Sequence, residues 1–118
     1  MKNFKQLLIW QRGIQIATGA FKLVATFPGE QKYSLSSQIT RAAVSIPSNI
    51  AEGGSRSSDK EYNRFLEISL GSAYEVETHL LIAESIGMGN EALRLSLLND
   101  VHEEQKMLIS FMNKIKNS

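Results

Sequence analysis

The chain has 118 residues, 42% of them hydrophobic, with no cysteine and a formal net charge of +1 at pH 7. Its length fits one hydrophobic core, so we expect residues 1–118 to form a single domain, and the lack of cysteine excludes disulfides, zinc–thiolate sites and iron–sulfur clusters. No apolar run approaches the roughly 18 residues of a membrane span and residues 1–15 lack a signal-peptide pattern, so we expect a cytoplasmic protein without membrane contact.

The first predicted helix covers residues 4–25. Its apolar residues recur at steps of three and four, which places them along one side of a helix. We expect this side to face the core: Leu7, Trp10, Ile14, Ala17, Phe21 and Val24. Pro28 and Gly29 follow, and proline disfavours the helical conformation in the residue before it.

The second predicted helix covers residues 34–52, with Ser34 as its N-cap and Gly53 and Gly54 as its end. Its predicted core face holds Leu35, Ile39, Ala42, Ala43, Ile46 and Ile50. Between residues 35 and 51 the only charged residue is Arg41. A helix with almost no charged face is normally buried on more than one side. We therefore expect its second side, with Thr40, Val44 and Ala51, to meet another subunit or a ligand.

Two further helices complete the predicted fold. The third begins after Ser58, which forms a capping box with Glu61, and runs to about residue 86. Its inward stripe is Phe65, Leu66, Ser69, Ala73, Val76, Leu80 and Ala83. The fourth begins after Asn90, and Glu104 interrupts its apolar stripe of Leu93, Leu97, Val101, Leu108, Phe111 and Ile115. The predicted fold is all-α, an antiparallel up-down four-helix bundle.

The sequence contains no familiar catalytic arrangement. His79 and His102 lie on different predicted helices without metal-ligand spacing around either, and we expect ordinary surface or boundary residues. The loop at residues 53–58 precedes a helix and could hold a phosphate, but it lacks P-loop spacing and needs no ligand to join two helices. We therefore expect no enzymatic activity, no metal and no cofactor.

A polar stripe flanks the apolar face of the second helix: Gln38, Arg41, Ser45, Asn49 and Glu52. Arg41 and Glu52 are roughly 16 Å apart along the axis, so they cannot pair with each other. We expect other partners, from Glu75, Glu77 or Glu104 for the arginine and from Arg56 or Arg64 for the glutamate. The favoured interpretation is a buried polar network that fixes helix register or a subunit contact. A nucleic-acid or small-ligand site is the alternative.

Residues 41–53, RAAVSIPSNIAEG, resemble the core signature of the four-helix-bundle family named for 23S ribosomal RNA intervening-sequence proteins. The similarity extends over YSLSSQITRAAVSIPSNIAEG at 33–53 and FLEISLGSAYEVETHLLIAESIG at 65–87, and includes Leu7, Trp10 and the Phe27-Pro28 pair. The resemblance therefore covers most of the chain.

This resemblance implies a left-handed antiparallel four-helix bundle that assembles into a ring-like homopentamer and has no known catalytic activity. Some members are encoded inside intervening sequences of ribosomal RNA genes. Relatives are accessory proteins of diversity-generating retroelements, in which a basic surface binds nucleic acid. The matching positions with an architectural character here are Arg41, Ser45, Pro47, Asn49, Glu52, Gly53, Ser72 and Glu75.

Charge is unevenly distributed along the sequence. Residues 1–56 carry seven lysines or arginines against two acids, whereas the remainder carries six against ten. Such an imbalance indicates either an anionic partner or helices that complement each other. Together with the resemblance, it leads us to predict a homo-oligomer that binds RNA or another nucleic acid through Arg12, Lys22, Arg56, Lys60 and Arg64. The alternative is a protein–protein adaptor that presents its helix ends to a partner such as a polymerase.

Overall fold

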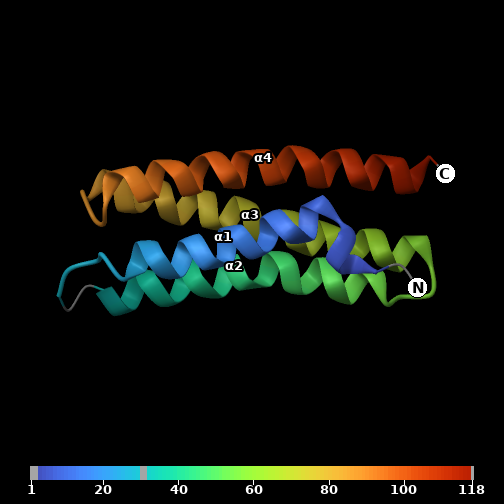
Figure 1. Cartoon of the computed structure of the whole chain (residues 1–118), viewed down its shortest axis with the longest axis horizontal. Helices are drawn as coiled ribbons and strands as arrows, with labels where there is room; N and C mark the ends of the chain where they lie inside the picture. The colour runs from blue at the N-terminus through green and yellow to red at the C-terminus, as the bar shows by residue number, and fades with distance from the viewer. Residues whose placement is uncertain (1–2, 30–31, 118) are drawn as a thin grey trace.

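The computed structural model describes residues 3–29 and 32–117, which form a bundle of four helices (Figure 1). After a 3-10 turn at Phe4–Gln6, these are α1 (Leu8–Val24), α2 (Lys32–Gly54), α3 (Asp59–Ser85) and α4 (Glu91–Lys116). The described residues contain no strand, so the all-α bundle predicted from sequence is confirmed. None of the helices, over the residues described, combines the length and apolar character needed to cross a bilayer.

Each helix packs against two of the other three. Helix α1 lies next to α2 and α4, and α3 lies next to the same two helices, whereas the backbones of the described parts of α1 and α3 are not neighbours. The bundle measures 48 by 20 by 20 Å. Figure 1 shows the α1–α2 and α3–α4 connections at one end, and the α2–α3 connection at the other end together with the first and last described residues.

Two of the predicted helix starts are confirmed by their capping hydrogen bonds. The Ser58 hydroxyl accepts from the Glu61 amide at 3.1 Å, and the Asn90 side chain accepts from the Leu93 amide at 2.9 Å. Helix α2 begins two residues before the predicted cap and continues through Gly54. The first predicted helix is interrupted at Leu7, whose extended backbone separates the 3-10 turn from α1.

The predicted core face of α1 is wrong. Phe21 and Ile14 are 55% and 41% exposed, and the other four residues of that stripe are only half-buried. The side that faces the core holds Ile9, Gly13, Ile16, Ala20 and Leu23. These residues also recur at steps of four and three, so spacing cannot separate the two sides.

The core faces predicted for the other helices are largely confirmed. All six residues predicted on α2 are buried except Leu35, which is half-buried. On α3 only Phe65 of the predicted stripe is not fully buried. On α4 the core residues are Arg94, Leu97, Val101, Glu104, Leu108 and Met112, whereas Leu93 is exposed.

Glycine permits close helix contacts at two positions. A Cβ on Gly13 would lie 3.1 Å from the Pro47 Cβ, so α1 approaches α2 at the proline inside that helix. A Cβ on Gly53 would lie 2.9 Å from the Phe65 Cβ and 3.0 Å from the Tyr62 ring. Side chains at either position would force neighbouring helices apart.

Hydrogen bonds join the two connections at the end opposite the termini. The Thr26 hydroxyl donates to the Leu23 carbonyl at 2.6 Å and accepts from the Asn90 amide at 2.9 Å. The buried Arg94 guanidinium donates to the Met88 carbonyl at 3.0 Å and to the Gly89 carbonyl at 3.3 Å. The two connections therefore form one closed end of the bundle.

Candidate functional site

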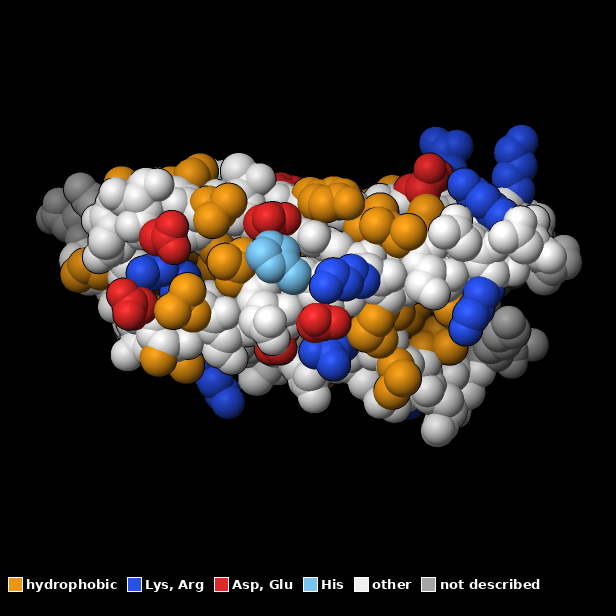
Figure 2. Space-filling view, turned by 90° about the horizontal axis from the view of Figure 1, so that it is seen from above, with side chains coloured by type: hydrophobic (Ala, Val, Ile, Leu, Met, Phe, Trp, Pro, Cys, Tyr) orange, Lys and Arg blue, Asp and Glu red, His pale blue; other side chains and the backbone are white. Residues whose placement is uncertain are grey.

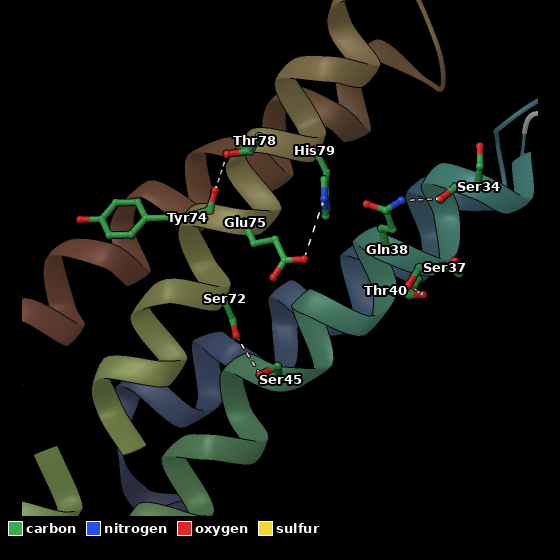
Figure 3. Close-up of polar contacts among 10 residues, drawn as sticks. All are labelled: Ser34, Ser37, Gln38, Thr40, Ser45, Ser72, Tyr74, Glu75, Thr78 and His79. Atoms are coloured by element: carbon green, nitrogen blue, oxygen red, sulfur yellow. Dashed lines mark hydrogen bonds and ion pairs between the residues drawn. The ribbon is translucent and has the colours of Figure 1, made fainter. Parts of the chain in front are cut away.

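The centre of the predicted polar stripe joins α2 to α3. The Ser72 hydroxyl donates to the Ser45 hydroxyl at 2.8 Å (Figure 3), and the Asn49 amide donates to the Ser45 hydroxyl and carbonyl, both at 2.8 Å. One turn away, the buried Ser69 hydroxyl donates to the Ile46 carbonyl at 2.9 Å. These bonds satisfy polar groups between the helices and fix their relative register.

The remaining residues of the stripe lie at the surface. Gln38 donates only to the carbonyl of Ser34, at 3.2 Å, and Glu52 pairs with Arg56 at 2.9 Å, which is one of the two partners expected for it. Arg41 is exposed and forms no ion pair with a described residue, so the expectation of a buried Arg41 partnered by a glutamate is wrong. An exposed guanidinium remains hydrated and needs no protein partner.

His79 differs from its predicted character, because it is 94% buried on α3 instead of lying at the surface or boundary. Its Nε2 atom lies 3.9 Å from the carboxylate of Glu75, which is exposed and is one of the partners predicted for Arg41 (Figure 3). With Gln38 and Thr78 it lines a hollow of about 740 Å³ between α2 and α3. No group of three metal-binding side chains occurs among the described residues.

A polar cluster that the sequence did not indicate joins α3 to α4. The Glu77 carboxylate accepts from the Gln105 amide at 2.8 Å and lies 3.0 Å from the His102 Nε2 atom. The hydrogen bond from Gln105 and that from His102 lower the pKa of Glu77. Because these residues are about 25 positions apart in sequence, no local spacing could have revealed the cluster.

Glu104 is a fully buried carboxyl group in the bundle core. Neither of its carboxyl oxygens has a hydrogen-bond partner. Burial raises the pKa of Glu104 to about 8, and the nearby Arg12 guanidinium opposes this shift only in part. Arg12 itself forms an ion pair with Asp100 at 3.6 Å. A pKa of about 8 favours the protonated form of Glu104 at neutral pH.

The structure does not bring the five predicted nucleic-acid-binding residues into one patch. Arg12 pairs with Asp100 on α4, and Lys22 lies in the last turn of α1, at the closed end of the bundle. Arg56, Lys60 and Arg64 instead line one hollow of about 540 Å³ beside the α2–α3 connection. The Arg56 guanidinium lies 4.5 Å from the centre of the Phe65 ring. This cation–π contact holds the guanidinium against the ring.

Three lysines outside the predicted set lie at the same end. Lys116 shares a hollow of about 440 Å³ with Lys60, and Lys106 and Lys114 line an adjacent hollow on α4. Figure 2 shows Lys and Arg side chains gathered toward this end on the face it presents. We name the six residues Arg56, Lys60, Arg64, Lys106, Lys114 and Lys116 the basic end.

An uncharged surface runs along the outer flank of α1 and α2. Arg12 and Gly19 mark the side of α1 toward α4, and Gly13 marks its side toward α2. Successive residues of a helix are turned by about 100°. The residues of α1 that were predicted to face the core therefore lie on the outer side of α1 next to α2. On α2, Pro47 faces α1 and Ser45 faces α3. The same helical geometry therefore places Val44 on the outer side of α2 next to α1. We name the combined surface the α1–α2 face: Ile14, Ala17, Phe21, Thr40, Val44 and Ala51.

Comparisons with known proteins agree with this fold. Residues 5–110 match the family model described as 23S rRNA-intervening sequence protein. The chain is also similar to the crystal structure of a protein of unknown function from the S23 ribosomal protein family of Bacteroides thetaiotaomicron. That similarity has a TM-score of 0.79 and 29% sequence identity, over 89% of this chain and 98% of the other. No protein with a curated description matches. Because the family model spans far more than half of the chain, the chain belongs to the 23S rRNA-intervening sequence protein family.

Proposed function

We propose that the chain is a non-enzymatic, homo-oligomeric bundle protein that binds RNA or another nucleic acid through a basic surface. One observation carries the proposal: Arg56, Lys60 and Arg64 line a single hollow at the α2–α3 connection, where the three cations outnumber the two acids, Glu61 and Glu67. Lys60 and Arg64 form no ion pair with any residue in the described part of the chain, so both are free to contact phosphates. Clustered, unpaired cations are the electrostatic footprint of nucleic-acid binding.

The test is a titration of fluorescent RNA with the purified, nuclease-treated protein at several salt concentrations. Phosphate binding should weaken steeply with salt, with a log–log slope of about −0.9 per contact on a duplex and about −0.7 on a single strand. Replacing both Lys60 and Arg64 by alanine should reduce the affinity and make the slope shallower. If the wild-type protein shows no salt-sensitive binding at micromolar concentration, the proposal fails.

Assembly is the second part of the proposal. The antiparallel bundle would form a ring-like homopentamer, as its family resemblance implies, and the course of the helices in Figure 1 supports the antiparallel arrangement. The α1–α2 face supports self-association, because Phe21, Ile14 and Val44 are each at least 41% exposed and no charged residue lies among them. Exposed apolar surface of this kind marks interaction sites.

A protein–protein adaptor is the second candidate, and the same α1–α2 face favours it. In that case the face binds a different protein, and the chain has no direct contact with nucleic acid. Purification from cells would then recover one defined protein partner, and nuclease treatment would leave that complex intact. Loss of the partner after nuclease treatment would instead support binding through nucleic acid.

A further inference from the structure

We infer that the basic end binds the phosphate backbone of a nucleic-acid duplex, and that Lys114 and Lys116 of α4 are part of this site. The inference rests on the proposed nucleic-acid function and specifies where on the molecule, and to which form of nucleic acid, the chain binds. It assigns a role to the carboxyl-terminal turn of α4, which contains no residue of the predicted set.

The first argument is spatial continuity. Lys60 lines both the hollow with Arg56 and Arg64 and the hollow with Lys116, so these residues form one surface across α3 and α4. Lys114 lies two residues before Lys116, about 200° around the helix from it, and lines a separate hollow on α4 with Lys106. The surface therefore continues from the α2–α3 connection to Lys116 of α4, and Lys114 extends the positive charge to another side of the same helix end, on a bundle about 20 Å wide.

The second argument is the availability of charge. Arg56 is engaged by Glu52 at 2.9 Å, and Lys106 lies 3.9 Å from Glu103. The other four members, Lys60, Arg64, Lys114 and Lys116, form no ion pair with any residue that the structure describes. The acids that line the same hollows are only Asp59, Glu61 and Glu67. Four cations without an ion-pair partner therefore remain to contact phosphates, beside these three acids.

The third argument separates duplexes from single strands. Proteins that bind single strands combine positive charge with exposed aromatic side chains on which bases stack. In the described residues the well-exposed aromatic side chains are Phe21 and Tyr74, which lie at the closed end of α1 and midway along α3. At the basic end, Phe65 has Arg56 over its ring, and Phe111 lines a hollow with Lys106 and Lys114; both rings are only partly exposed. This end thus offers charges without a stacking platform, which suits a base-paired backbone.

The experiment measures binding of a 20-base-pair RNA duplex, the matching DNA duplex and the corresponding single strands by fluorescence anisotropy between 0.05 and 0.3 M NaCl. Four phosphate contacts predict a log–log slope of about −3.6 on the duplexes, and weaker binding to the single strands. Comparison of the two duplexes shows whether RNA or DNA is preferred.

Three matched substitutions locate the site. Lys114→Ala and Lys116→Ala should each weaken duplex binding about eightfold at 0.1 M salt and make the slope shallower by about 0.9. Lys22→Ala, at the closed end, should change neither. Lys116→Arg keeps the charge and should restore binding, and circular dichroism should show unchanged helix content in every variant.

The outcomes distinguish the inference from the proposed function. Duplex binding that is lost in Lys22→Ala but kept in Lys114→Ala and Lys116→Ala overturns the inference alone. Tighter binding to single strands than to duplexes also overturns it, while the proposed function stands. Absence of salt-sensitive binding to every nucleic acid overturns both.

Discussion

Burial in the bundle core shifts the pKa of Glu104 strongly from its ordinary value. Its carboxyl group is fully buried, without a hydrogen-bond partner, and its pKa is raised to about 8. In the unfolded chain the group titrates near its ordinary value of 4.5. Between these two values the folded chain holds a proton that the unfolded chain releases. Glu104 therefore contributes a free energy of unfolding that falls as pH rises from about 4.5 to about 8.

Glu104→Gln tests this pH dependence. The amide has nearly the shape of the protonated acid and cannot ionise, so the variant should gain stability over the wild type as pH rises, by a few kcal/mol at most at pH 8. Urea unfolding of both proteins at pH 5, 6.5 and 8 measures the difference. The two proteins share every other titratable group, so the difference between their pH curves isolates Glu104. Parallel pH curves would contradict the assignment.

At the scale of single elements, the contact between α2 and α3 depends on Gly53 in the last turn of α2. A Cβ there would meet the Phe65 Cβ at 2.9 Å, and this atom cannot move without its backbone. Gly71, within α3, provides the contrast, because nothing lies within 4 Å of the position of its Cβ. The same substitution should therefore have opposite effects at the two glycines.

Gly53→Ala should destabilise the protein by about 1–3 kcal/mol, because the added methyl group pushes α2 away from α3. Gly71→Ala should stabilise it by about 0.5–1 kcal/mol, because alanine loses less conformational entropy in a helix. Chemical denaturation of the two variants gives both values. Equal effects at the two positions would show that the α2–α3 contact is looser than described.

Sequence periodicity predicts three of the four core faces and fails on α1 for a definable reason. That helix carries two apolar sides with the same spacing, and the predicted one holds the larger side chains, including Trp10 and Phe21. The side that packs inward contains Gly13 and Ala20, because the bundle needs close approach there. Apolar content therefore misleads where a helix must pack through small residues.

For the whole molecule, the exposed stripe of α1 becomes a prediction about assembly. Phe21→Ser removes the most exposed large side chain of the α1–α2 face and should not disturb folding, because Phe21 is 55% exposed. Light scattering on a sizing column should show an oligomer for the wild type and a smaller species for the variant. Ile109→Ser, at a 43% exposed position on α4, is the matched control and should leave the assembly intact. A wild-type protein that is monomeric at tens of micromolar would contradict the proposal.

The arrangement of charge in the folded molecule could not be predicted from the order of residues. Along the sequence, residues 1–56 carry seven basic residues against two acids, whereas the last 62 residues carry six against ten. The fold places the end of α4 beside the start of α3, so Lys116 shares a hollow with Lys60, 56 residues earlier in the chain. Only the tertiary path of the chain forms the basic end and separates Lys22 from it.

The position of the chain ends has a practical consequence for experiments. The first and last described residues lie at the basic end (Figure 1), so a purification tag fused to either terminus would emerge beside Lys114 and Lys116. A charged tag there could mask or imitate the interaction being measured. Gly29 follows α1 at the opposite end, is exposed, and has open space around it. A label inserted at that loop would lie at the opposite end of the 48 Å bundle from the basic end and would report on binding from there.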